Sequence, residues 1–230
     1  MQHIEHYIFD LDDTLYPATN GMFAQISERI TRRVAETLQL PPDEARAVQK
    51  QYWKQYGTSL RGLIVNHDVD AEAFLADVHD VPVEAFLTRD EALRSMLLRL
   101  PGRRHVFTNS PREYACRVLA ALGVDDLFEN VFDIRHSDLR PKPDPHAYAR
   151  LLDAIGAPAS TCLFVDDAPR NLPPARDRGM LTVWLRSPHS MAGGSPGLSV
   201  ASADDAPAHL TIDTLAQLEG ALSRHVTPRP

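Results

Sequence analysis

The chain has 230 residues, of which 43% are hydrophobic and 24% are charged, as in an ordinary soluble globular protein. Its formal net charge of -7 argues against a nucleic-acid partner, because nucleic-acid-binding surfaces are basic. No apolar run approaches the roughly 18 residues of a membrane span, and the polar residues 1–6 do not resemble a signal peptide. We therefore expect a cytoplasmic protein without membrane contact, in which Cys116 and Cys162 are reduced thiols.

The first predicted strand is the short apolar run 7–9, and a long helical interval follows it. This interval is much longer than the single crossover helix that joins two parallel strands. Apolar residues at helical spacing, together with proline and glycine stops, predict four helices in it. They cover 23–38, a segment from an Asp43 cap to a Gly57 stop, 60–65 and 71–78.

Strands and helices alternate in the second half of the chain. The predicted strands are 105–107, 131–134, 162–165 and 181–185. Helices are predicted over 112–122 and 145–155, each ended by a glycine, and 187–208 is predicted as a loop before an edge strand at 209–212 and a helix at 215–222. Alternation of this kind predicts an α/β fold with a doubly wound, Rossmann-like parallel sheet.

The long helical interval after the first strand predicts two domains. We expect an α/β core domain made of residues 1–17 and 90–230, with a helical cap domain made of residues 18–89 inserted after strand 1. The cap is expected over the carboxyl edge of the sheet, where open α/β sheets bind their ligands.

Polar residues with catalytic potential stand at or just beyond the ends of the predicted strands. These residues are Asp10, Asp12, Thr108, Asn109, Lys142, Asp166 and Asp167. Because parallel strands end at the same edge of a sheet, we expect these side chains to meet in one cleft. Each short motif alone also suits an ordinary turn, a helix cap or a solvated loop, and only their conjunction favours a catalytic site.

Carboxylates gathered in one cleft repel one another, by about 4 kcal/mol for a close pair at an effective dielectric constant of 20. A cation among them removes this cost, and oxygen ligands of this kind suit Mg²⁺, which in turn recruits phosphate oxygens. Lys142 and the donors of Thr108 and Asn109 add positive character around a phosphoryl group. A nucleophilic aspartate would divide phosphate ester hydrolysis into two easier displacements.

In this order, the segment 10–14, Thr108-Asn109, Lys142 and Asp166-Asp167 resemble the four motifs of the haloacid dehalogenase-like superfamily. The resemblance implies that Asp10 is the nucleophile and a metal ligand, and that Asp12 is the acid/base. It also implies that the long insertion is a C1-type helical cap.

The same resemblance assigns roles to the other motif residues. Thr108 and Asn109 would hold phosphoryl oxygens, and Lys142 would neutralise charge on the nucleophile and the phosphate. Mg²⁺ would be held by Asp10, the Asp12 backbone carbonyl and Asp167, with Asp166 binding directly or through water. The acid at position 12 indicates phosphate chemistry, because dehalogenase members of the superfamily lack it.

Segments 9–17 and 56–63, together with Gly21-Met22-Phe23, resemble the pyrimidine 5'-nucleotidase-like subgroup. The expected substrate is therefore a small phosphate ester, and among such esters a pyrimidine nucleoside monophosphate is favoured. Arg61 of the cap is a candidate substrate-binding residue, although an exposed salt bridge suits it equally. Aromatic residues that either stack on a base or form the cap core are Tyr16, Phe23, Tyr52, Trp53 and Tyr56.

Three other activities share parts of this pattern. They are phosphatases of sugar phosphates or phosphoglycolate, phosphomutases, and receiver domains that are phosphorylated on aspartate. Receivers place their acidic pair at strand 1, whereas the pair Asp166-Asp167 comes late here, which argues against a receiver. A non-catalytic scaffold is disfavoured because every core motif residue is present, and the sequence carries no signal for an oligomeric state.

Overall fold

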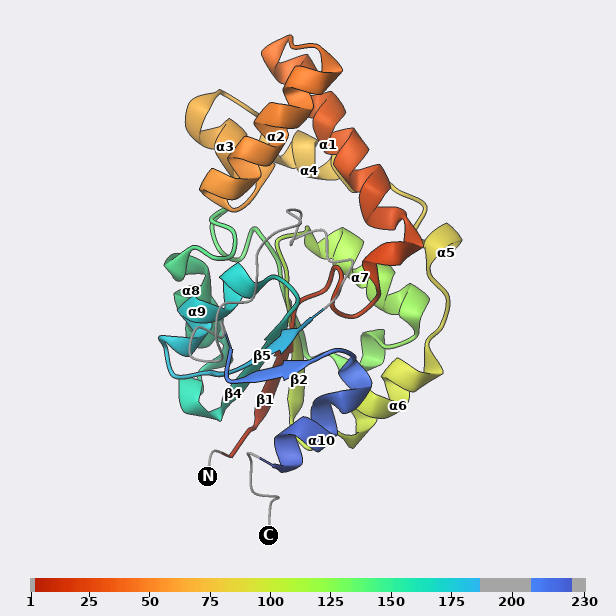
Figure 1. The fold of residues 1–230 in the computed structure, drawn as a ribbon, viewed down its shortest axis with the longest axis vertical. Helices are drawn as coiled ribbons and strands as arrows, with labels where there is room; N and C mark the ends of the chain where they lie inside the picture. Colours follow the sequence, from red (N-terminus) through yellow and green to blue (C-terminus); the bar gives the residue numbers. More distant parts are fainter. Residues whose placement is uncertain (1–2, 187–207, 225–230) are drawn as a thin grey trace.

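Six parallel strands form one twisted sheet in the computed structural model, which describes residues 3–186 and 208–224 (Figure 1). The strands are β1 (His6–Phe9), β2 (Arg103–Phe107), β3 (Asn130–Phe132), β4 (Cys162–Asp166), β5 (Leu181–Leu185) and β6 (Leu210–Ile212). Their order in the sheet is β3-β2-β1-β4-β5-β6. The predicted doubly wound α/β core is confirmed, and the strand order reverses between β1 and β4, where such sheets bind ligands.

Helices cover both faces of the sheet, because alternate side chains of each strand point to opposite sides. Tyr7 and Phe9 of β1 join the cluster that contains α6 (Glu91–Arg99), α7 (Arg112–Leu122) and α10 (Leu218–Ser223). Ile8 joins the opposite cluster, which contains α8 (Pro145–Ile155) and α9 (Leu172–Arg176). The sheet is therefore buried on both faces, as its nearly continuous apolar strands predict.

A helical layer stands above the carboxyl edge of the sheet in Figure 1. It consists of α1 (Met22–Leu38), α2 (Pro42–Tyr56), α3 (Ser59–Asn66) and α4 (Ala71–Val78), and α5 (Val83–Phe86) follows beside the core. The four helices share a hydrophobic cluster built around Val34, Leu63 and Phe74, which Ile134 joins from the segment after β3. Val81 and Val83 instead pack in the cluster of the sheet, so the chain has returned to the core by this point.

Several details differ from the sequence-based expectations. Asp43 does not cap α2: the helix starts at Pro42 with Pro41 at the N-cap position, and Asp43 lies in the first turn. Helices α5 and α6 were not predicted, and the predicted last helix is a 3-10 turn followed by the short α10. The 3-10 turns are Ala18–Asn20, Asp125–Leu127, Ala159–Thr161, Pro169–Asn171 and Leu215–Gln217.

Other expectations concern the loop predicted over 187–208, the cysteines and membrane contact. The loop predicted over 187–208 lies outside the described residues, except for Ala208, which is buried. Both cysteines are free thiols as expected; Cys116 is exposed and Cys162 is buried. Within 3–186 and 208–224, every helix is too short or too polar to cross a bilayer.

A buried histidine pair joins β1 to β2. The Nδ1 atom of His6 lies 3.1 Å from Nε2 of His105, and the two rings stack with centroids 5.3 Å apart. Burial first, and then the charges of His6 and of nearby arginines, lower the pKa of His105 to about 4. The folded protein therefore holds His105 neutral over a pH range in which the unfolded chain protonates it.

We expect acid to destabilise the fold through His105. In the unfolded chain its pKa is about 6.5, so the free energy of unfolding should fall between pH 6.5 and pH 4, by about 3 kcal/mol in all. Urea unfolding at pH 7 and pH 4 measures this loss. Over this pH range, His105→Gln should lose less of its free energy of unfolding than the wild type does. His3→Gln, a change at an exposed position, should lose as much as the wild type. Equal losses in all three proteins would contradict this account.

Candidate active site

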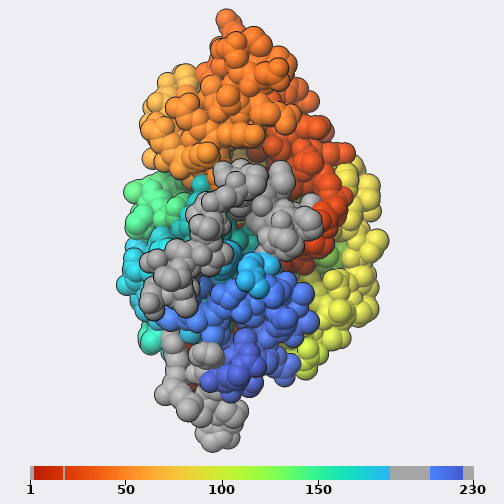
Figure 2. All heavy atoms as spheres, in the orientation of Figure 1, coloured from red at the N-terminus to blue at the C-terminus, as the bar shows by residue number. Residues whose placement is uncertain are grey.

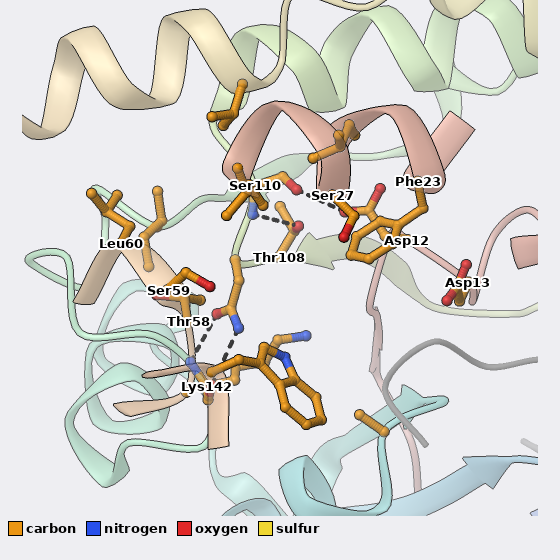
Figure 3. Close-up of a pocket in the computed structure, with 18 of the residues that line it drawn as sticks. Asp12, Asp13, Phe23, Ser27, Thr58, Ser59, Leu60, Thr108, Ser110 and Lys142 are labelled. Atoms are coloured by element: carbon orange, nitrogen blue, oxygen red, sulfur yellow. Dashed lines mark hydrogen bonds between the residues drawn. The ribbon is translucent and has the colours of Figure 1, made fainter. Parts of the chain in front are cut away.

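A cavity of about 560 Å³ lies between the helical layer and the carboxyl edge of the sheet. The space-filling view shows the helical layer, in orange, packed on the core (Figure 2). In the close-up, Thr58, Ser59 and Leu60 of the insertion lie on one side of the cavity, and Asp12 and Phe23 on the other (Figure 3). The cavity thus stands over the point where the strand order reverses.

Lys142 is the centre of the polar cluster at the floor of this cavity. Its Nζ donates to Oδ1 of Asp10 at 2.7 Å, to Oδ2 of Asp166 at 2.8 Å and to the carbonyl oxygen of Phe107 at 2.8 Å. Only 1% of the lysine is exposed, and its ammonium group also lies over the rings of Phe107 and Phe164. A fully buried ammonium group needs such partners, and here all its donor positions are used.

Asn109 fixes the backbone of Lys142. Its Oδ1 accepts from the Lys142 N–H at 2.8 Å, and its Nδ2 donates to the Lys142 carbonyl oxygen at 3.2 Å (Figure 3). These bonds tie the end of β2 to the loop after β3. In this structure Asn109 therefore positions Lys142, in addition to lining the cavity as the sequence predicted.

Asp166 is held by two donors besides Lys142. Asn171 Nδ2 lies 3.0 Å from both of its carboxylate oxygens, and the N–H of Ala168 donates to Oδ1 at 2.8 Å. Asn171 thus supports the loop that follows β4. The side chain of Asp166 is fully buried and cannot turn away from Lys142 without losing these bonds.

Asp10, Asp166 and Asp167 can offer one oxygen each to a common cation, since these atoms lie within 4.8 Å of one another. All three residues are buried. If all three are ionised, Lys142 compensates only one of their charges, so the donor set favours a further cation. A set of hard carboxylate oxygens suits Mg²⁺ better than softer metals.

The electrostatics of Asp10 lead to the same conclusion. Burial raises the pKa of Asp10 well above its ordinary value; Lys142 opposes this shift, and the charges of Asp166, Asp167 and Asp12 add to it. Burial lowers the pKa of Lys142, but the charges of Asp10 and Asp166 outweigh burial and raise it. A cation among the carboxylates would favour the ionised form of Asp10, which is the nucleophilic form.

Asp12 lies at the cavity wall within a set of hydroxyl groups. The hydroxyl of Tyr16 donates a short hydrogen bond to Oδ1, and that of Tyr114 lies 3.0 Å from the same oxygen. Ser110 donates to Oδ2 at 2.7 Å, so both carboxylate oxygens are engaged. The sequence-based reading did not connect Tyr114 or Ser110 with Asp12; the one signal was a tyrosine on the buried face of α7.

The remaining candidates divide between the cavity and its surroundings. Thr108 lines the cavity, and its hydroxyl accepts from the N–H of Ser110 at 3.0 Å. Arg61 is not among the described residues that line the cavity; its backbone N–H is bonded by the Thr58 side chain, which caps α3. Arg170, not predicted from the sequence, does line the cavity.

Comparison with known proteins identifies the family. The model of haloacid dehalogenase-like hydrolases matches residues 4–179, which is well over half of the chain. The chain belongs to the haloacid dehalogenase-like hydrolases. The superfamily resemblance seen in the sequence is thereby confirmed, and the match includes every motif residue from Asp10 to Asp167.

Curated proteins similar to this chain include some that are named as phosphatases. Phosphoglycolate phosphatase of Rhodospirillum rubrum is 30% identical over 77% of this chain and 78% of its own length. Phosphate metabolism protein 8 of Saccharomyces cerevisiae is 29% identical over 76% of this chain. The chain spans only 59% of the length of this yeast relative.

Solved haloacid dehalogenase-like structures share the fold. L-2-haloacid dehalogenase of Xanthobacter autotrophicus aligns over 97% of this chain and all of its own, with a TM-score of 0.60 and 15% identity. A HAD phosphatase of Thermococcus onnurineus aligns over 95% of this chain and 98% of its own, with a TM-score of 0.56 and 19% identity. At these identities the likeness concerns the fold alone.

Proposed function

We propose that this chain is a cytoplasmic, Mg²⁺-dependent phosphomonoesterase in which Asp10 is the nucleophile. The observation that carries the proposal is the buried arrangement of Lys142 between Asp10 and Asp166, with Asp167 close enough to share a cation. Relatives named as phosphatases support phosphate chemistry, as does the acidic residue at position 12.

In the proposed reaction, a carboxylate oxygen of Asp10 attacks phosphorus, and the bond from phosphorus to the ester oxygen breaks. Asp12 gives its proton to the departing oxygen. A water molecule then loses a proton to Asp12 and attacks the phosphoryl group, which leaves Asp10 as free phosphate. Asp12 loses a proton in the first displacement and regains one in the second, so water and the ester are the only reactants.

The surrounding residues stabilise charge during these steps. Lys142 lies 2.7 Å from Oδ1 of Asp10 and would neutralise charge on the nucleophile. Thr108 and Asn109 line the cavity at the end of β2 and would hold the phosphoryl oxygens. Mg²⁺, held by Asp10, Asp166, Asp167 and the Asp12 carbonyl oxygen, would supply electrostatic stabilisation of the phosphoryl oxygens.

We further propose the division into a core domain, residues 1–17 and 90–230, and a C1-type cap domain, residues 18–89. The hydrophobic cluster that α1 to α4 share supports a cap built from these helices, while Val81 and Val83 already pack with the core, ahead of the boundary at residue 89. The cap would close the cavity above the phosphoryl group and exclude bulk water, which strengthens the electrostatic interactions within it.

The substrate that we propose is a nucleoside monophosphate, preferably of a pyrimidine. Support comes from the cap segment 56–63, whose sequence resembles the pyrimidine nucleotidase-like subgroup. Gly57, Thr58, Ser59 and Leu60 of this segment line the cavity. The proposed leaving group would therefore lie against the residues that carry the resemblance.

A substrate panel tests this proposal. With Mg²⁺ present, UMP or CMP should be hydrolysed with the highest kcat/KM in a set that also includes phosphoglycolate and hexose phosphates. Removal of Mg²⁺ by a chelator should abolish phosphate release, and added Mg²⁺ should restore it. A clear preference for phosphoglycolate, the substrate in the name of the Rhodospirillum relative, would replace the nucleotide proposal. Phosphate release that survives removal of Mg²⁺ would contradict the proposed dependence on the metal.

A further inference from the structure

We propose that Trp53 is the stacking platform for the planar base of the substrate, an inference that rests on the proposed nucleotide hydrolysis. Trp53 lies on the last turns of α2, is half-buried and lines the cavity. As a specificity-determining residue it would select esters with a planar ring, independently of the chemistry at phosphorus.

The structure separates the aromatic candidates from one another. Tyr16 is buried against Asp12, and its hydroxyl is engaged there. The hydroxyls of Tyr52 and Tyr56 bond to His67 and Asn66, and neither tyrosine lines the cavity. Among these candidates, only Phe23 and Trp53 contribute to the cavity wall.

Trp53 is distinguished from Phe23 by its partner Arg170. The guanidinium carbon of Arg170 lies 3.6 Å from the centroid of the indole ring, in a stacked cation–π contact. The two terminal nitrogens of Arg170 donate at 3.0 Å to the carbonyl oxygens of Trp53 and Gly57. The arginine is therefore fixed by the end of α2, and it in turn covers one face of the indole.

This contact gives a rigid platform. An indole already held in place loses little conformational freedom when a ligand stacks on it, so more of the stacking energy appears as affinity. Burial lowers the pKa of Arg170 only to about 10, so the guanidinium remains charged at neutral pH. Because Arg170 occupies one face of the indole, we expect the base to stack on the other face.

The position of Trp53 relative to the reacting groups suits the base of a nucleotide. The end of α2 packs on the Lys142 loop: a Cβ atom placed on Gly57 would lie 2.9 Å from the Lys142 carbonyl oxygen. Arg170 belongs to the loop that follows Asp166 and Asp167. Trp53 is thus tied to both loops of the phosphoryl site and lines the same cavity as Asp10 and Asp167.

The test compares UMP with ribose 5-phosphate, which carries the same phosphoryl group on the same sugar carbon but has no base. In Trp53→Leu, kcat/KM for UMP should fall about tenfold or more, in line with alanine substitutions of base-stacking residues. For ribose 5-phosphate it should change by less than about twofold. Trp53→Phe should retain part of the preference for UMP, and Phe23→Leu is the matched control for loss of an aromatic ring.

Binding is measured separately in the Asp10→Asn background, in which turnover is blocked. UMP should quench tryptophan fluorescence there, ribose 5-phosphate should not, and the additional change Trp53→Leu should remove the quenching. Equal losses for both substrates in Trp53→Leu, or a selective loss in Phe23→Leu instead, would overturn the inference. Failure of the wild type to release phosphate from either ester would instead refute the proposed function, while the quenching by UMP would still report on the platform.

Discussion

Replacement of Asp10 by asparagine is expected to reduce Mg²⁺-dependent phosphate release from an aryl phosphate by roughly 10⁴-fold or more. The amide has nearly the same shape and still offers an oxygen to Lys142, but it is not a nucleophile. The fold should survive, because the change removes one of three mutually repelling buried carboxylates. Steady-state release of phosphate at saturating Mg²⁺ measures the effect.

The matched control is Asp153→Asn, on the exposed side of α8. It makes the same chemical change away from the cavity and should leave kcat/KM within about twofold of the wild type. Retained turnover in Asp10→Asn would refute the role of Asp10 as nucleophile.

The second large effect is expected for Lys142→Met. Methionine retains the apolar stem beside Phe107 and Phe164 but removes the only side-chain cation bonded to Asp10 and Asp166 among the described residues. Loss of one partner of a buried ion pair typically costs 3–5 kcal/mol, so we expect a drop of about this size in the free energy of unfolding at pH 7 without Mg²⁺. Phosphate release should be lost as well.

Urea unfolding with Lys50→Met as control tests this expectation. Lys50 is exposed, so the control should change the free energy of unfolding by no more than about 0.5 kcal/mol. If Lys142→Met were as stable as the control, the buried cluster would not depend on the lysine charge, and the electrostatic account of the site would be wrong.

Much of the core could be predicted from the sequence because its signals are local. Apolar runs that end in polar residues identified the strands, and glycine stops gave the observed ends of α7 and α8. The convergence of Asp10, Lys142 and Asp166 followed from topology, since parallel strands end at one edge. The helix over 71–78 was likewise predicted with its observed bounds.

The parts that were missed depend on tertiary contacts. Tyr114 fits the apolar face of α7. Only the packing of α7 against the loop after β1 brings the Tyr114 hydroxyl to Asp12. Arg170 stands in a loop, and its partners on α2 are more than a hundred residues away in the chain. The start of α2 was misjudged because Pro42 occupies the first helical position, where its missing N–H costs nothing, so Asp43 is not needed as a cap.

Trapping of the phosphorylated intermediate tests the central claim most directly. Asp12→Ala should still accept a phosphoryl group from an aryl phosphate, because a good leaving group needs little protonation, but it should transfer that group to water slowly. Acid quenching followed by peptide mass spectrometry should then find one phosphoryl group on the peptide that contains Asp10, matched by a burst of one equivalent of aryl alcohol. A phosphoryl group on any other peptide, or aryl alcohol and phosphate released together without an adduct, would contradict the account.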